Sequence, residues 1–268
     1  KIFKLKNRTY KNPLIVHYSN IKDLNKDCKT NKIFNILYKK FCPGPLTFIL
    51  NKKNNSKISK YVTANKRTVA IRFPKNILTR NLLSKINFPL AAPSANISTK
   101  VSPVKADHVR TDFGNKIKFI LDGGKCKIGL ESTILDLTGR IMVLRPGAIT
   151  IEQLQRALKR KIIFNHKLNK IKSPGQLKLH YSPGIPVRMN AKYPKKNEAF
   201  LQLKSKIKNK INYFSLSKKG NMKEAAKNLF TMLRYIKNKG YSSIAVEKIS
   251  RKGLGLAIND RLKKASNK

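Results

Sequence analysis

The opening of the chain carries three cations at alternate positions. Lys4, Lys6 and Arg8 are each separated by one residue, so on an extended segment their side chains would point to one side. Three cations on one face, with no acid among them, suit a triphosphate. A solvated basic strand in a lysine-rich protein is the simpler explanation of this spacing, which by itself assigns no site.

Arg72 is more informative because it interrupts an apolar run. It lies in TVAIRFP, residues 68–74, which otherwise suits a buried strand. A buried guanidinium needs a carboxylate or a phosphate as its partner, and acids are scarce, with 12 Asp and Glu against 60 Lys and Arg. Arg72 therefore predicts either an internal ion pair or an anionic ligand.

Further polar groups stand where other apolar runs end. His17 closes a run of Leu, Ile and Val, where a histidine is more often structural than functional. Residues 91–96, AAPSAN, combine small residues with a hydroxyl and an amide, and small residues let a ligand approach the backbone closely. Two more runs border polar clusters, at 131–133 (EST) and 145–147 (RPG). Together these ends predict a polar cleft formed by several strands.

Several common site motifs are absent from the sequence. It contains no GxxxxGK[ST] phosphate loop, no GxSxG nucleophile elbow and no metal-site spacing of His, Asp and Glu. The GLGLAIN stretch lacks the third glycine of a dinucleotide-binding fingerprint. Cys28, Cys42 and Cys126 show no CxxC spacing, which argues against a disulfide framework and a zinc site and favours the reducing cytoplasm.

The composition narrows the class of protein. No run reaches the roughly 18 apolar residues of a membrane helix, which excludes an integral membrane protein. The formal net charge is +48, but the cations are spread along the whole chain, so compositional bias explains most of them. A basic surface would still favour non-specific binding of RNA, double-stranded RNA included.

The elements that would position these groups form two patterns. Residues 1–168 alternate short β-rich runs with helical stretches. Strands are predicted at 46–50, 68–73, 118–122, 132–137 and 141–145, the last two as a hairpin. Helices are predicted at 19–41, 74–86, 103–113 and 150–160, the last with Thr150 as its N-cap and Gln153 three residues later.

The remainder of the chain is predicted to form a linker and a small α/β domain. Residues 187–268 predict a helix at 198–207, a strand at 211–216, a helix from Met222, a strand at 243–246 and a final helix in 253–262, a small doubly wound pattern. The prolines and glycines of 169–186 suit an ordered linker, which contains His180 and Tyr181. The predicted division is therefore a catalytic domain at 1–168, a linker at 169–186 and a C-terminal domain at 187–268.

Seven ordered segments resemble the threonylcarbamoyl-AMP synthase family. They are IFKLKNRTYKNPLIVH, CPGPLTFIL, TVAIRFP, AAPSANIS, ESTILDL, LRPGAIT and SPGQLKLHYSP. GLGLAINDRL fits the longer form of the family, and the resemblance covers nearly the whole chain. It implies a YrdC-like α/β domain, with a twisted mixed sheet and flanking helices around a positive cavity, and a smaller Rossmann-like α/β domain.

The resemblance also implies a reaction. A nucleotidyltransferase of this family forms threonylcarbamoyl-AMP and pyrophosphate from ATP, L-threonine and bicarbonate, with Mg²⁺ carried by the ATP phosphates. A tRNA threonylcarbamoyl transferase complex would then use the adenylate to modify the adenosine beside the anticodon. These expectations place the protein in the cytoplasm.

The family's residues can be assigned from the matching motifs. Its KxR and SxN motifs match Lys6–Arg8 and Ser94–Asn96, so the implied catalytic residues are Lys6, Arg8, Ser94 and Asn96. The resemblance places ATP against Arg8, Asn12, Thr68, Ser94, Ser102, Arg145 and Tyr181, with Tyr181 bringing the linker over the nucleotide as a lid. It places L-threonine against His17, Arg72, Ser132 and the backbone near Ala92, with Arg72 pairing with the threonine carboxylate.

The sequence departs from the family pattern in three respects. Asn7 stands where the family has glycine, so Asn7 must tolerate a positive φ, and Thr9 stands where it has proline. The family also has a PTET-like strand that touches threonine before the position of Lys1, so we expect the natural chain to begin earlier.

Three alternatives to the synthase stay open at this point. An RNA-binding module would explain the lysines but not Arg72 or Ser132. A paralogue on the same fold would carry out a different carbamoyl or acyl transfer, although the linker and C-terminal domain favour the synthase. A catalytically inactive regulatory copy is the third, and the intact KxR and SxN motifs argue against it.

Overall fold

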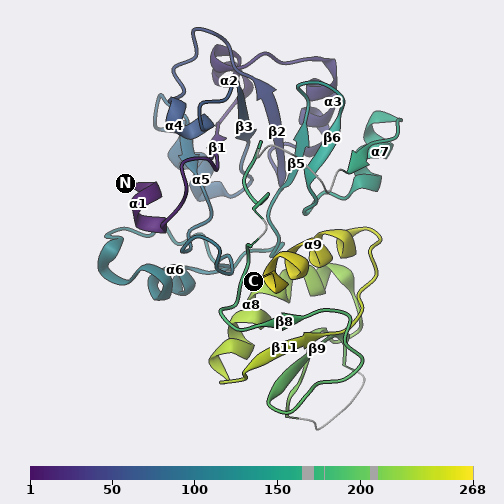
Figure 1. Cartoon of the computed structure of the whole chain (residues 1–268). Coiled ribbons are helices and arrows are strands. Elements are labelled where there is room, and N and C mark those ends of the chain that lie inside the picture. The colour runs from purple at the N-terminus through teal and green to yellow at the C-terminus, as the bar shows by residue number, and fades with distance from the viewer. Residues whose placement is uncertain (165–171, 178, 206–210, 268) are drawn as a thin grey trace. The chain divides into compact units, whose positions relative to one another are not determined.

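The computed structural model describes residues 1–164, 172–177, 179–205 and 211–267 (Figure 1). The chain forms two compact units. Unit 1 comprises Lys1–Lys4, Arg8–Pro93 and Glu131–Gln176, and unit 2 comprises Leu5–Asn7, Ser94–Leu130 and Leu177–Lys268. The predicted division at residues 168 and 186 stays a prediction, since compactness alone does not define a domain that folds by itself.

Unit 1 is built on a mixed seven-stranded sheet, as predicted for an α/β protein. Its strands are β1 (Ile15–His17), β2 (Leu46–Asn51), β3 (Thr68–Arg72), β4 (Leu90–Ala92), β5 (Thr133–Asp136), β6 (Met142–Arg145) and β7 (Ile163–Phe164), in the spatial order β4-β1-β3-β2-β5-β6-β7. β1 is parallel to β3, β3 is antiparallel to β2, and β5 and β6 form the predicted antiparallel pair. Four of the five predicted strands are confirmed.

Short helices connect and cover these strands. They are α2 (Ile21–Asp27), α3 (Lys32–Phe41), α4 (Lys60–Thr63), α5 (Ile77–Ser84) and α7 (Ile151–Leu158). Helix α1 (Ile2–Lys6) has residues in both units. The predicted helical stretch at 19–41 is two helices, because Asn20 and Asn31 each cap a new N-terminus, their side chains accepting from the N–H groups of Asp23 and Phe34.

The core of unit 1 lies between β2, β3, β5 and their helices. The side chains of Phe34, Leu37, Phe48 and Leu135 are fully buried, and the ring of Phe34 meets that of Phe48 edge-on at 4.9 Å between centroids. β2 is buried along five of its six residues, which explains its continuous apolar sequence. The core therefore fixes the strands whose ends carry the candidate site.

Unit 2 contains a four-stranded parallel sheet in the order β10-β9-β11-β8. The strands are β8 (Val187–Arg188), β9 (Glu198–Lys204), β10 (Tyr213–Ser217) and β11 (Ser243–Val246), and the helices are α6 (Ala106–Phe113), the short 3₁₀ helix η1 (Gly114–Lys116), α8 (Met222–Asn238) and α9 (Leu254–Ser266). Helices α8 and α9 contact each other and the sheet (Figure 1). This arrangement confirms the smaller α/β fold.

Residues 94–130 share a hydrophobic core with the C-terminal helices. Val101, Val104 and Leu130 belong to the same buried cluster as Leu229 and Leu233 of α8. The segment that contains the SxN motif is thus packed within unit 2.

Two secondary-structure predictions are wrong. Residues 198–207 were expected to be helical, but 198–204 form β9, whose first five residues are all buried; a strand covered on both faces loses the alternation that would identify it. Residues 118–122 form no strand, and Phe119 is 90% exposed. High β-propensity at 118–122 is not matched by a partner strand in the part of the chain that the structure describes.

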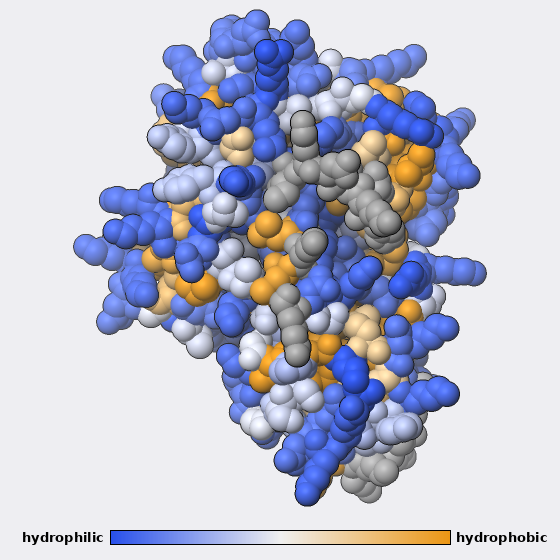
Figure 2. Space-filling model, viewed as in Figure 1, coloured by the Kyte–Doolittle hydropathy of each residue, from blue (hydrophilic) through white to orange (hydrophobic). Residues whose placement is uncertain are grey.

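The surface agrees with the lysine-rich composition. The face of the molecule in Figure 2 is mostly hydrophilic, and apolar residues gather on it only in small groups. None of the described helices combines the length and hydropathy needed to cross a membrane.

The capping box of α7 offers a test of local stability. Thr150 Oγ1 accepts from the N–H of Gln153, whose side chain accepts from the N–H of Thr150. We expect Thr150→Ala to lower the free energy of unfolding by about 1 kcal/mol, measured by urea denaturation. Thr30→Ala is the control, because no hydrogen bond of the Thr30 side chain is found among the described residues; equal midpoints for both variants would contradict the role of the cap.

Candidate active site

A row of polar side chains crosses the sheet of unit 1. His17 at the end of β1 lies directly opposite Arg72 at the end of β3, and Thr47 on β2 lies opposite Arg72 from the other side. Residues paired in this way point to the same face of a sheet. Arg72 is half-buried, and its Nε donates to the carbonyl of Gly44 at 3.1 Å. Imidazole, guanidinium and hydroxyl groups therefore stand side by side.

The row continues through Ser132, immediately before β5. Ser132 Oγ lies 2.7 Å from Thr47 Oγ1 and accepts from Arg145 Nη2 at 3.0 Å. The guanidinium of Arg145 also donates to the Ser132 carbonyl, from Nη2 at 2.8 Å and Nε at 3.1 Å. All three side chains are buried, so the Ser132 hydroxyl is held from two sides. The structure thus brings together three predicted threonine-site residues and one predicted ATP contact.

Arg8 is a second buried cation in unit 1. It is 7% exposed, and its guanidinium donates to the carbonyls of Asn12 at 3.2 Å and Pro13 at 2.8 Å. Burial lowers the pKa of Arg8 to about 10. No carboxylate among the described residues pairs with it. A buried guanidinium without a counter-ion is costly and favours an anionic ligand.

Asn12 accepts a hydrogen bond from Arg8 through its carbonyl, and its side chain is a second group that favours a bound ligand. The Asn12 side chain is fully buried, yet neither its Oδ1 nor its Nδ2 has a hydrogen-bond partner in the described part of the chain. A buried amide without partners is unusual in a folded protein. Arg8 and Asn12, both predicted ATP contacts, therefore form an incomplete polar site.

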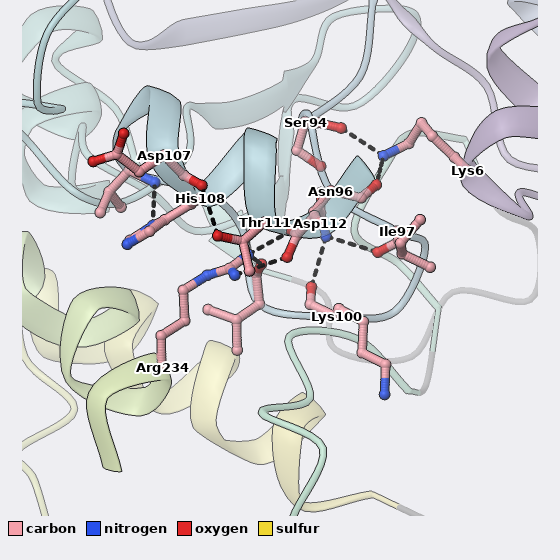
Figure 3. A network of polar contacts seen from close by, with 12 residues as sticks. Lys6, Ser94, Asn96, Ile97, Lys100, Asp107, His108, Thr111, Asp112 and Arg234 are labelled. Atoms are coloured by element: carbon pink, nitrogen blue, oxygen red, sulfur yellow. Dashed lines mark hydrogen bonds and ion pairs between the residues drawn. The ribbon is translucent and has the colours of Figure 1, made fainter. Parts of the chain in front are cut away.

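In unit 2, Lys6 of the KxR motif contacts Ser94 and Asn96 of the SxN motif (Figure 3). The prediction that Lys4, Lys6 and Arg8 share one face of an extended segment is wrong, because residues 2–6 form helix α1. Lys4 is exposed there, whereas Lys6 is 4% exposed and its Nζ donates to the carbonyls of Ser94, at 2.5 Å, and of Asn96. Asn7 has φ 51°, which confirms that it tolerates the positive φ. Lys6 thus holds the SxN loop.

The other predicted contacts in unit 2 are also buried. Asn96 is 1% exposed and its Nδ2 donates to the carbonyls of Ile97 and Lys100, while Ser102 is buried two residues beyond Lys100. Tyr181 is fully buried with φ 63°, its ring stacked on Phe230 at 5.5 Å and facing the Arg261 guanidinium at 5.3 Å. In this conformation the Tyr181 ring belongs to the core, so its role as a lid stays a prediction.

Two predicted residues lie apart from the row. Thr68 begins β3 and Arg72 ends it, so about 13 Å separates them along the strand. Ala92 is exposed at the end of β4, where it pairs with Ile15 rather than with His17. The structure therefore brings neither residue to the His17–Arg72 pair.

Thr47 is a residue that the sequence analysis missed. It lies in the run LTFIL, and a single hydroxyl in an apolar run looked compatible with an ordinary strand. Its full burial and its contact with Ser132 identify it as part of the row. The only signal in the sequence was a polar residue at the start of an otherwise apolar strand.

The imidazole of His17 is neutral. Burial and, to a smaller extent, the nearby charge of Arg72 together lower the pKa of His17 to about 4. Nδ1 donates to the carbonyl of Leu90 at 3.3 Å, which leaves Nε2 as an acceptor. His17 can therefore accept a hydrogen bond from a substrate without adding a positive charge.

No group of three or more His, Cys, Asp or Glu side chains that could hold a metal ion occurs among the described residues.

These features define an α/β protein with a row of polar and cationic side chains at its strand ends. Comparison with known proteins identifies the family within this class of α/β proteins. The family model described as "Telomere recombination" (Sua5_yciO_yrdC) matches residues 1–147, and the model "Threonylcarbamoyl-AMP synthase, C-terminal domain" matches residues 149–267.

Individual relatives agree with the family models. The threonylcarbamoyl-AMP synthase of Pyrococcus abyssi is 34% identical over 99% of this chain and 83% of its own length. Enzymes of the same name from Schizosaccharomyces pombe and Bacillus subtilis are also 34% identical, over 79% and 82% of their lengths. The crystal structure of P. abyssi Sua5 complexed with L-threonine superposes with a TM-score of 0.89 at 33% identity, over 99% of this chain and 83% of that one.

The chain belongs to the threonylcarbamoyl-AMP synthase family, in the two-domain form that carries the Sua5 C-terminal domain. It is an enzyme, an ATP-using transferase of tRNA threonylcarbamoyladenosine modification.

The depressed pKa of His17 predicts a pH-dependent stability. In the unfolded chain His17 takes up a proton below its ordinary pKa of 6.5, whereas in the folded protein it stays neutral down to about pH 4. The unfolded state therefore binds more protons in this window, and stability is lost as the pH falls from 6.5 towards 4. We expect His17→Gln to remove up to about 3 kcal/mol of this loss, measured by urea unfolding across the window. An identical pH dependence in parent and variant would show that His17 is already protonated when folded.

Proposed function

We propose that this enzyme joins ATP, L-threonine and bicarbonate into threonylcarbamoyl-AMP and pyrophosphate, with the nucleotide bound at Arg8 and Asn12. The observation that carries this assignment is the buried Arg8 guanidinium beside the amide of Asn12. Among the residues that the structure describes, Arg8 has carbonyl acceptors but no carboxylate, and the Asn12 amide has no partner. ATP phosphates would supply the missing negative charge, and an adenosine or ribose group could satisfy the amide.

The row on unit 1 suits the other substrate, L-threonine. Arg72 would pair with its carboxylate in the fork geometry that guanidinium favours. Neutral His17 and the hydroxyl of Ser132 would bind its polar groups, and Thr47 and Arg145 would hold Ser132 in place. The relative from P. abyssi has been crystallised with L-threonine, which supports the assignment.

The chemistry requires positioning rather than a covalent enzyme intermediate. The threonine amine attacks bicarbonate and water leaves, which gives N-carboxythreonine. A carboxylate oxygen of this carbamate then attacks the α-phosphorus of ATP, and the bond to the departing pyrophosphate breaks. The enzyme would contribute alignment of the two reactants and stabilisation of charge on the phosphates, with Mg²⁺ bound to the phosphates as part of the substrate.

Unit 2 would contribute further nucleotide contacts. Ser94, Asn96, Ser102 and Tyr181 are the proposed contacts there, and Asn96 Oδ1 has no partner among the described residues. The Lys6 ammonium is used by the carbonyls of Ser94 and Asn96. We therefore assign Lys6 to shaping the loop as well as to the phosphates. Thr68, Arg145 and the backbone near Ala92 complete the proposed set.

A second enzyme must use threonylcarbamoyl-AMP soon after it forms, because a mixed carboxylic–phosphoric anhydride is labile in water. We propose a tRNA threonylcarbamoyl transferase complex in the cytoplasm as that partner. The net charge of +48 would in addition favour non-specific contact with tRNA or other RNA, and this contact would weaken steeply as salt is added.

Replacing Arg8 and Arg72 in separate variants tests the assignment of ATP to Arg8 and of L-threonine to Arg72. Arg8→Met removes a buried charge at similar volume, and we expect it to weaken ATP binding by about 30-fold or more while leaving L-threonine binding unchanged. Arg72→Gln should have the opposite effect, because it removes the partner of the threonine carboxylate. Isothermal titration of each variant with each substrate measures both constants.

The two variants serve as controls for each other. If Arg8→Met binds ATP as the parent does, the nucleotide site lies elsewhere. If either variant loses both substrates together, the two sites are not separate as proposed.

A further inference from the structure

Helix α8 reaches the loop of the proposed nucleotide site through Arg234. The Arg234 guanidinium makes a bidentate ion pair with Asp112 of α6, from Nη1 to Oδ1 at 2.9 Å and from Nη2 to Oδ2 at 2.7 Å (Figure 3). Nη2 also donates to the carbonyl of Val101 at 2.6 Å. The two charged side chains are only 18% and 14% exposed, so solvent screens this contact weakly.

Val101 is the residue immediately before Ser102, a proposed ATP contact. Its N–H donates to the carbonyl of Ser182 at 3.1 Å, and the N–H of Ser182 donates to the carbonyl of Thr99 at 2.8 Å. Both backbone groups of Val101 are therefore held, the N–H by the linker beside Tyr181 and the carbonyl by Arg234.

The loop is anchored at its other end by different residues. Lys6 binds the carbonyls of Ser94 and Asn96, and Asn96 Nδ2 binds the carbonyl of Lys100 at 2.7 Å (Figure 3). Lys6 thus fixes the start of the loop and Arg234 its end. A lysine in place of Arg234 could not make the planar, three-acceptor contact.

We propose that Arg234 is a positioning residue of the nucleotide site. It holds Val101, and through it Ser102, in the geometry that binds ATP, and so gives the C-terminal region a direct part in adenylate formation. This inference rests on the proposed role of Ser102 in ATP binding. The fold of unit 2 does not depend on the ion pair alone, because Leu229, Phe230 and Leu233 of α8 are buried in its core.

The test compares Arg234→Gln with Arg110→Gln. Arg110 forms an ion pair with Asp107 on the same helix as Asp112, but both partners are largely exposed, and such pairs contribute little. The constants to measure are the ATP and L-threonine dissociation constants, the KM for each substrate and the melting temperature. For Arg234→Gln we expect ATP affinity to fall by about tenfold and threonine affinity to stay close to the parent value, with a lower melting temperature because Asp112 loses its partner. The ATP affinity of Arg234→Lys should lie between those of the parent and Arg234→Gln, and the ATP affinity of Arg110→Gln should match that of the parent.

Two results would overturn the inference. Parental ATP affinity in Arg234→Gln would show that the contact with Val101 does not position the site. A parallel loss of ATP and threonine affinity would show a structural role only. Ser102→Ala separates this inference from the proposed function: if that variant binds ATP normally, the assignment of the loop itself fails, whereas weakened binding with Arg234→Gln unaffected rejects Arg234 alone.

Discussion

The scarcity of carboxylates is the constraint on which the candidate site depends. With 12 acidic residues against 60 basic ones, few carboxylates are available as partners for a buried cation. Several acids that the structure describes already serve structural contacts: Asp27 accepts from Tyr18 and Ser56, Asp112 pairs with Arg234, and Asp136 pairs with Lys172. Among the described residues, Arg8 is paired with carbonyl dipoles and with no carboxylate, and dipoles offset only part of the cost of burying its charge. In the function proposed above, the phosphates of ATP would supply the counter-charge, and their binding would stabilise the folded enzyme.

The strand register fixes how the side chains of the candidate site lie relative to one another. Because His17, Arg72 and Thr47 are paired across neighbouring strands, the packing of the sheet itself sets their spacing, and no flexible loop has to place them. Ser132 and Arg145 extend the row from the next two strands. Within unit 2, Val101 and Val104, which follow Ser94 and Asn96, share a hydrophobic core with α8, so packing against the C-terminal helices positions this segment.

The sequence predicted the parts of this account that depend on local pattern. The apolar runs of β2, β3, β5 and β6 and the capping box of α7 follow from neighbouring residues, and the ordered motifs identified the family. The register of the strands could not be predicted from the sequence. Thr47 was missed for this reason, because only the pairing of β2 with β3 places its hydroxyl beside Arg72. Segment 198–204 was predicted to be helical because Glu, Ala, Leu, Gln and Lys are good helix formers, whereas burial between neighbouring strands decides its conformation. Residues 2–6 form a helix where alternating cations had suggested an extended segment.

The central claim is that one enzyme couples ATP cleavage to both L-threonine and bicarbonate. The most direct measurement is pyrophosphate release by the purified protein, followed with both substrates present and with each omitted in turn. The account predicts release only when threonine and bicarbonate are both present, with threonylcarbamoyl-AMP formed in equal amount. Release that is indifferent to threonine, from a folded protein that binds ATP, would contradict it and indicate a different acyl or carbamoyl transfer on the same fold.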